Sequence, residues 1–144
     1  PEVTASSYAF TGEPNLDIIA GWEEVLTSVD DPSKIVCDAR SPEEFSGKDV
    51  RAAAGGHIPE AQNVNWNRAV DEQGVFLPAA ELQEIYDGEG IQGDQVVFTL
   101  CQTAVRATHS WFVLQELLGY ETVKVYDGSW TEWGNRTDLP ITTR

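Results

Sequence analysis

The sequence predicts an α/β domain with a mainly parallel sheet that is covered by helices on both faces. Short apolar segments typical of buried strands alternate along the chain with segments that have helical spacing, which is the pattern of βαβ units. The strongest strand candidate, 95–100 (QVVFTL), is continuously apolar, as expected of a central strand in a parallel sheet. No repeat or linker divides the chain, so we expect a single domain over residues 1–144.

The first elements follow from spacing and from helix-start signals. Residues 15–29 (NLDIIAGWEEVLTSV) place apolar side chains near one stripe and predict a helix. Residues 34–39 (KIVCDA) predict a short buried strand. In residues 41–45 (SPEEF) the serine is a helix N-cap, the proline takes the first helical position, and the second glutamate is placed to close a capping box.

The later elements are predicted by the same kinds of signal. They are a short strand in 62–66 (QNVNW), a turn at 71–76 (DEQGVF), an amphipathic helix at 78–86 (PAAELQEIY), a helix at 106–119 (RATHSWFVLQELLG) that stops at Gly119, a strand at 123–126 (VKVY) and a short helical turn at 128–135 (GSWTEWGN).

Composition and charge exclude several functional classes. The formal net charge of −15, from 24 acidic and 9 basic residues, disfavours nucleic-acid binding, which needs many lysines and arginines on phosphates. No segment approaches the ~18 continuous apolar residues of a membrane span. No signal pattern opens the chain, and we expect a cytoplasmic protein. The chain begins at Pro1, so we also consider that an upstream signal or domain has been removed. The acidity fits either a soluble acidic surface or adaptation to high salt.

The two cysteines, Cys37 and Cys101, differ in their surroundings. With no C-x-x-C pair and no histidine cluster, no metal is expected. Cys37 lies inside an apolar strand and is expected in the core. Cys101 ends the strongest strand, and the segment CQTAVR joins it to a helix. Ligands of parallel sheets bind beyond the carboxyl ends of strands, so this segment and DARSPEE (38–44) are the candidate site segments.

A sharp turn after Cys101 would let successive backbone N–H groups point toward one centre. Such a nest, backed by the positive end of the following helix, binds anions. A thiolate is itself an anion, so this setting stabilises it, and Arg106 adds a cation at the end of the turn. The pattern indicates a nucleophilic cysteine with an anion-binding cradle. The alternative is an inert buried cysteine at a strand end.

Several motifs in order resemble the C-terminal catalytic half of tandem rhodaneses, the thiosulfate sulfurtransferases. They are IVCDARSPEEFSG (35–47), GGHIPEAQNVNW (55–66) and CQTAVRATHSWFVLQELLGYETVKVYDGSWTEWGN (101–135). The resemblance covers about Ile35 to Pro140, with a first strand and helix expected before it. It implies a rhodanese-like, doubly wound parallel sheet flanked by helices on both faces.

The resemblance also implies a reaction and its residues. Cys101 would take a sulfane sulfur from thiosulfate, become a persulfide, and pass the sulfur to cyanide or to a thiol such as that of thioredoxin. Arg40 and Arg106 would hold the sulfonate oxygens, and Trp130 would border the cleft. The remaining substrate-binding residues would be those of the loop: Gln102, Thr103, Ala104 and Val105. No cofactor is implied, and an N-terminal rhodanese domain would be the natural partner.

Departures and alternatives follow from the same residues. The loop from Cys101 to Arg106 has six residues, whereas phosphatases of this fold have one more, and Leu100 replaces the histidine that usually precedes their cysteine. Gln102 and Thr103 are uncharged, so 3-mercaptopyruvate stays open as an alternative donor. A docking module without turnover is the other alternative, which the retained Cys101, Arg106 and Arg40 disfavour.

Both histidines are interpreted as structural. His57 is expected to pin a turn, because a thiolate needs no separate base, and His109 to pack on its helix. Many loops of this family carry glycine where Ala104 stands.

Overall fold

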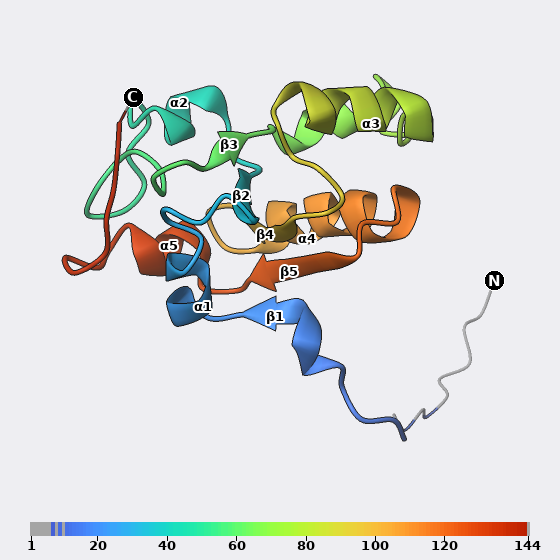
Figure 1. The fold of residues 1–144 in the computed structure, drawn as a ribbon, viewed down its shortest axis with the longest axis horizontal. Coiled ribbons are helices and arrows are strands. Elements are labelled where there is room, and N and C mark those ends of the chain that lie inside the picture. Colours follow the sequence, from blue (N-terminus) through green and yellow to red (C-terminus); the bar gives the residue numbers. More distant parts are fainter. Residues whose placement is uncertain (1–6, 8, 10, 144) are drawn as a thin grey trace.

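A five-stranded sheet forms the centre of the computed structural model, which describes residues 7, 9 and 11–143 (Figure 1). Its strands are β1 (Ile19–Ala20), β2 (Lys34–Asp38), β3 (Gln62–Asn63), β4 (Val96–Leu100) and β5 (Thr122–Tyr126). All neighbouring strands pair in parallel, in the order β1-β5-β4-β2-β3. β4 lies in the middle, which confirms the prediction from its continuous apolar sequence.

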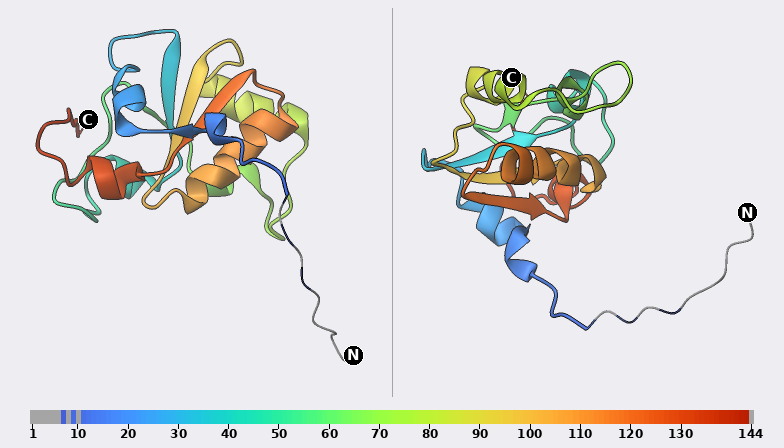
Figure 2. Two further views of the ribbon diagram at one scale, coloured as in Figure 1. Left: turned by 90° about the horizontal axis from the view of Figure 1, so that it is seen from below. Right: turned by 90° about the vertical axis from the view of Figure 1, so that its right-hand side faces the viewer.

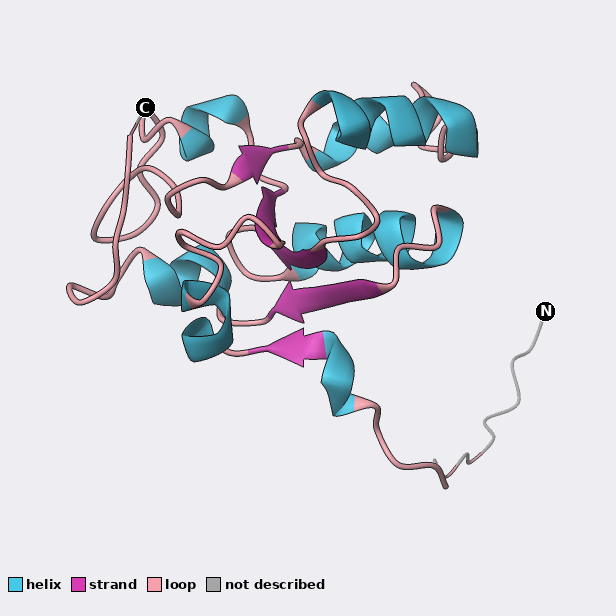
Figure 3. Ribbon diagram, viewed as in Figure 1, coloured by secondary structure: helices cyan, strands magenta, loops and turns pink. Residues whose placement is uncertain are grey.

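The helices lie where the start and stop signals place them, apart from the first and from the 3-10 helix Trp66–Ala69, which begins inside the strand predicted over 62–66 (Figure 3). They are α1 (Trp22–Leu26), α2 (Pro42–Phe45), α3 (Ala79–Gly88), α4 (Val105–Phe112), α5 (Ser129–Trp133), the 3-10 helices Leu16–Ile18 and Trp66–Ala69, and a π-helical turn, Val113–Leu117, that continues α4. Both halves of the predicted capping box form at α2. Gly119, at a φ of +71°, follows the π-helical turn and ends the helix as predicted.

Two hydrophobic layers cover the two faces of the sheet. On one face, Val36 and Phe98 pack with residues of α1 and α5. On the other, the adjacent Cys37 and Val97 pack with residues of α3 and α4, because successive side chains of a strand point to opposite faces. Figure 2 shows these helix groups on opposite sides of the sheet. The doubly wound arrangement is therefore observed.

The expectation of one helix over residues 15–29 is wrong. A 3-10 turn and β1 occupy its first part, and the helix begins only at Trp22. Gly21, in an extended conformation, separates the two, and the β-branched Ile19 of β1 favours extended structure. β1 pairs with β5, more than a hundred residues later (Ile19 beside Val125). The strand and helix that the family resemblance implies before Ile35 are both present.

No helix among the described residues is long and apolar enough to cross a membrane.

Gly56 lies in the loop before β3, where the backbone of Thr142 packs closely against it. Its φ is +113°, and a Cβ there would overlap the backbone carbonyl oxygen of Thr142. Gly56→Ala should lower the free energy of unfolding by about 3 kcal/mol, because a backbone atom cannot move aside cheaply. Gly74→Ala is the matched control, since Gly74 also has a positive φ but faces open space, and should cost about 1 kcal/mol. Equal losses in urea unfolding would contradict this account.

Candidate active site

The two predicted site segments meet at the carboxyl edge of the sheet. Asp38 and Leu100, the last residues of β2 and β4, are paired, and the backbone N–H of Ala39 donates to the Leu100 carbonyl at 2.9 Å. The chain then leaves the sheet as the arginine loop (residues 38–41) and the cysteine loop (residues 101–106). The parallel sheet therefore brings the two segments side by side, as the sequence predicts.

The cysteine loop has the backbone shape of a nest. Cys101 is a free, buried cysteine, and Ala104 has a left-handed backbone with a φ of +63° directly before α4. In the part of the chain that the structure describes, no hydrogen bond uses the backbone N–H of Gln102, Thr103, Val105 or Arg106. A left-handed residue between right-handed ones turns such N–H groups toward one concavity. The loop therefore offers free donors beside the thiol.

Ser129, which the sequence analysis missed, holds this shape. Its Oγ accepts hydrogen bonds from the backbone N–H groups of Cys101 (3.3 Å) and Ala104 (3.1 Å), and donates to the Tyr126 carbonyl (2.9 Å). The backbone N–H of Trp130 donates to the Cys101 carbonyl at 2.9 Å. The loop is thus fixed from β5 and α5, and the small polar residue after a strand in DGSW was the only local signal for it.

Both Nη atoms of the Arg106 guanidinium are already hydrogen-bonded within the protein. Its Nη1 and Nη2 donate to the two carboxylate oxygens of Glu44 at 2.7 and 2.9 Å. The Glu44 side chain is only 2% exposed, and that of Arg106 is 24% exposed. The hydrogen bond to Glu44 raises the pKa of the Arg106 guanidinium, and Cys101 adds a smaller upward effect. Arg106 is therefore close to the thiol but already ion-paired.

Glu44 holds an ionised carboxylate in this buried position. Burial works to raise its pKa, but hydrogen bonds from Arg106 and from the Ser41 backbone outweigh it and lower the pKa to about 2. The same carboxylate accepts from the Ser41 N–H at 3.1 Å as the second half of the capping box. The α2 cap predicted from the sequence thereby also anchors the cysteine loop.

The prediction that Arg40 contacts the substrate directly does not agree with its position in the structure. Its side chain is 1% exposed and forms an ion pair with Asp38 at 2.6 Å. Its Nη2 also donates to the Gly56 carbonyl at 2.8 Å, and Asp38 accepts from the Arg40 backbone N–H. Arg40 thus binds the protein interior instead of a sulfonate, because the Asp-x-Arg spacing folds the side chain back onto the strand end. Asp38 therefore fixes a backbone N–H of the arginine loop in addition to pairing with the Arg40 side chain.

Trp130 does not border a cleft. It is fully buried, its Nε1 donates to the Ala54 carbonyl at 3.1 Å, and the Arg40 guanidinium lies 4.2 Å from its ring centroid. The prediction of pocket lining is therefore wrong at this position. Because α5 packs on the sheet, both Trp130 and Trp133 belong to the core.

A small apolar cavity opens beside the start of α4. It has a volume of about 310 Å³ and is lined by Trp66, Val105, Arg106 and His109. Burial lowers the pKa of His109, whose ring packs against Trp66 and Phe76, as a packing residue is expected to do. Trp66, which the sequence analysis placed in a strand, is a site residue that it missed.

Gln102 joins the cysteine loop to a further arginine. Its Nε2 donates to the Arg51 carbonyl at 3.1 Å. The Arg51 side chain is 52% exposed, pairs with Asp49 at 2.6 Å and lies 3.6 Å from Glu44. Thr103 is exposed. Arg51 is therefore the most accessible arginine next to the loop, and no motif in the sequence indicated it.

The remaining candidates are structural. Cys37 is fully buried, and burial raises the pKa of its thiol, so it is the core cysteine that the sequence predicts. The His57 ring hydrogen-bonds the Phe45 carbonyl at 2.8 Å, and its backbone pairs with Thr142. A second hollow of about 500 Å³ lies along β3 and contains no residue of the cysteine loop.

This geometry defines a class of protein. It is a parallel α/β domain with a free cysteine in a nest at the end of its central strand. The family model of the rhodanese-like domain matches residues 22–136, and the chain belongs to that family.

Relatives and solved structures agree with that assignment. The chain is 43% identical over 148 residues to a Haloferax volcanii protein named "Putative thiosulfate sulfurtransferase", covering 98% of this chain and 51% of the relative. It is 43% identical over 126 residues to "Sulfur carrier protein TtuD" of Thermus thermophilus, covering 82% and 44%. The chain thus spans about half the length of the curated relatives it matches.

Two solved structures share the fold at low identity. A variant of EanB in complex with ergothioneine matches with a TM-score of 0.87 at 22% identity, over 98% of this chain and 36% of that one. The anaerobic ergothioneine biosynthesis enzyme from Chlorobium limicola matches with a TM-score of 0.81 at 24% identity, over 88% and 32%.

Ala104→Gly should stabilise the protein by about 0.5–1 kcal/mol, because glycine relieves the left-handed backbone that alanine adopts at a cost. Ala107→Gly is the matched control. It lies inside α4 with ordinary helical geometry and should lose about 1 kcal/mol or more. Urea unfolding measures both, and a loss of stability at position 104 would contradict the strain argument.

The lowered pKa of Glu44 predicts that the stability of the fold depends on pH in the acidic range. A folded-state pKa of about 2 against the usual 4.5 means that Glu44 contributes stability above pH 4.5 that is lost as the pH falls toward 2. Glu44→Gln should therefore be less stable than the natural sequence by about 2 kcal/mol at pH 7, with the difference shrinking below pH 4. Urea unfolding of both proteins across pH 3–7 measures this difference, and a constant difference would refute it.

Proposed function

We propose that this domain is a sulfurtransferase that moves a sulfane sulfur through a Cys101 persulfide. The observation that carries the proposal is the free Cys101 at the start of the cysteine loop. Among the described residues, four backbone N–H groups of this loop have no hydrogen-bond partner: those of Gln102, Thr103, Val105 and Arg106. Those donors fit an anionic sulfur, which needs hydrogen bonds but no metal or cofactor.

In the first half-reaction the Cys101 thiolate attacks the outer sulfur of thiosulfate. The new S–S bond forms as the bond to the sulfonate sulfur breaks, and sulfite leaves with its electron pair. In the second half-reaction cyanide or a thiolate attacks the sulfane sulfur, which returns Cys101 to its thiolate. Two steps through one covalent intermediate predict ping-pong kinetics.

Arg51 and the loop donors are the groups we assign to the sulfonate. Arg51 is half exposed beside the loop, whereas Arg40 is buried and the Arg106 fork is occupied by Glu44. Charge-assisted hydrogen bonds from a guanidinium are the usual means of holding such oxyanions. The relatives named for thiosulfate support this donor, and 3-mercaptopyruvate is the alternative.

A sulfur carrier without rapid turnover is the second candidate. The name of the Thermus relative supports it, and so does the apolar cavity beside the loop, which fits a thiol with an apolar body better than cyanide. A docking module without chemistry is a weaker alternative, because Cys101 and its nest are both present.

We also propose that a second rhodanese-like domain lies beside this one in the natural protein. The relatives are about twice as long as this chain. Val105, at the start of α4, is 74% exposed, and Phe112 on the same helix is 41% exposed. Residues seven positions apart lie near the same side of a helix, so these two side chains would form part of the surface that the second domain covers.

The intact mass of the protein after brief exposure to thiosulfate tests the persulfide. We expect a gain of about 32 Da, one sulfur atom, that cyanide then removes. Cys101→Ser should show no gain, because the remaining cysteine, Cys37, lies inside β2 and burial raises the pKa of its thiol. Persistence of the gain in that variant, or its absence with thiosulfate and 3-mercaptopyruvate alike, would reject the proposal. Slow release to cyanide but fast release to a protein thiol would favour the carrier.

A further inference from the structure

The arginines around the cysteine loop are all matched by carboxylates. Three arginines and three carboxylates form the ion pairs Arg40–Asp38, Arg51–Asp49 and Arg106–Glu44. Glu44 also approaches Arg51 at 3.6 Å. These groups sum to zero charge. Among the described residues, the positive field that a dianionic donor requires therefore comes mainly from backbone N–H groups and from the exposed parts of Arg51 and Arg106.

Glu44 is the carboxylate that pairs with the arginine of the cysteine loop. It meets Arg106 through two hydrogen bonds, whereas Asp38 faces away into the core beside Arg40. Its side chain is 2% exposed, so water and salt screen it weakly. Its charge is also fixed, because its pKa is lowered to about 2. Any anion that approaches Cys101 meets Arg106 and Glu44 together.

We propose that Glu44 sets the selectivity of the site for the charge of the sulfur donor, disfavouring dianions such as thiosulfate relative to singly charged donors of the same shape. This inference rests on the proposed function and assigns a specificity-determining role to a residue that does not itself react. Repulsion from a buried carboxylate acts on each unit of donor charge, so a dianion is penalised about twice as much as a monoanion.

Methanethiosulfonate is a donor matched to thiosulfate for this comparison. It carries a methyl group in place of one sulfonate oxygen and has one negative charge instead of two. The Cys101 thiolate attacks its outer sulfur, the bond between the two sulfurs breaks, and methanesulfinate leaves with the electron pair. Both donors therefore produce the same persulfide, and the ratio of their loading rates reports the effect of one charge.

The experiment measures the second-order rate constants for loading of Cys101 by both donors, followed by intact mass. In Glu44→Gln, which keeps a hydrogen-bond acceptor for Arg106 and for the cap, the ratio of thiosulfate to methanethiosulfonate should rise about tenfold. Glu44→Asp, which keeps the charge but displaces it, should slow both donors and leave the ratio within about twofold. Equal changes for both donors in Glu44→Gln would overturn the proposal and leave Glu44 a positioning residue.

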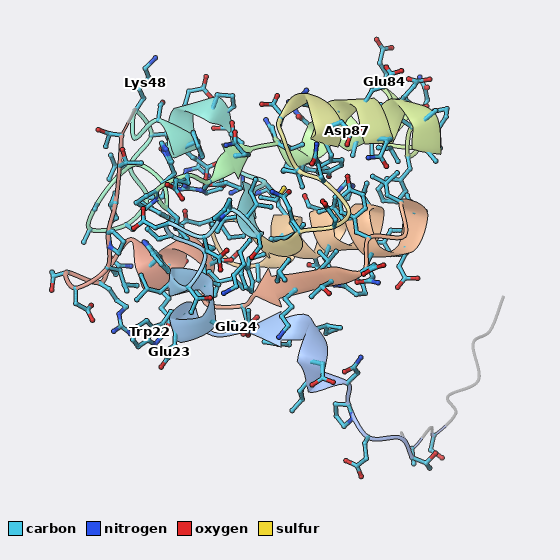
Figure 4. All side chains as sticks on the ribbon, viewed as in Figure 1. Trp22, Glu23, Glu24, Lys48, Glu84 and Asp87 are labelled. Carbon is cyan, nitrogen blue, oxygen red and sulfur yellow. The ribbon has the colours of Figure 1, made fainter. Side chains whose placement is uncertain are left out.

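Glu43→Gln is the matched control for net charge. Glu43 is the exposed neighbour of Glu44 on α2, so this variant removes the same charge from the surface. The natural surface is strongly acidic, with residues such as Glu23, Glu84 and Asp87 on its outer helices (Figure 4), and one exposed charge should alter the ratio less than about twofold. A tenfold rise in this control would assign the effect to the overall field and overturn the proposal.

The natural protein gives a test that does not depend on the folding of a variant. Its ratio of loading rates should lie below the ratio that a small free thiol shows with the same two donors, and a higher ratio would overturn the proposal. If neither of these donors nor 3-mercaptopyruvate loads Cys101 of the natural protein, the proposed function fails instead.

Discussion

The pairing of β2 with β4 is the constraint on which the site depends. Their last residues, Asp38 and Leu100, lie side by side, so the arginine loop and the cysteine loop leave the sheet at the same edge. Parallel strands force this arrangement, since all carboxyl ends share one edge. Cys101 is consequently placed where the two loops and the start of α4 converge.

A strongly acidic protein must still make a place for an anionic sulfur. With a formal charge of −15, its overall field opposes thiolates, persulfides and anionic donors alike. Backbone N–H groups of the cysteine loop can still stabilise an anion at Cys101, because their partial positive charges do not depend on the amino-acid composition. The arginines contribute less than their number implies. Each of the three around the cysteine loop is tied to a carboxylate, and Arg40 serves the core by stacking on Trp130.

Local signals predicted most of the fold and the chemistry-bearing loop. β4 followed from an apolar run, and the α2 cap from the pattern SPEEF, because both patterns act within a few residues. The errors arose where partners are distant in sequence. β1 forms by pairing with β5, Arg106 meets Glu44 from 62 residues away, and Ser129 reaches back across 28 residues to Cys101. The family resemblance assigned Arg40 to the sulfonate oxygens and Trp130 to the border of the cleft, whereas packing buries both.

The short helix α5 joins the two loops into one unit. Ser129 binds the backbone of the cysteine loop, and the next residue, Trp130, places its ring against Arg40 of the arginine loop. Ser129 adopts a positive φ of 48° to do so, a conformation that a serine holds only when its surroundings favour it. Those surroundings are its three hydrogen bonds and the buried tryptophan beside it. The geometry of the nest around Cys101 therefore depends on a segment that contributes no reacting group.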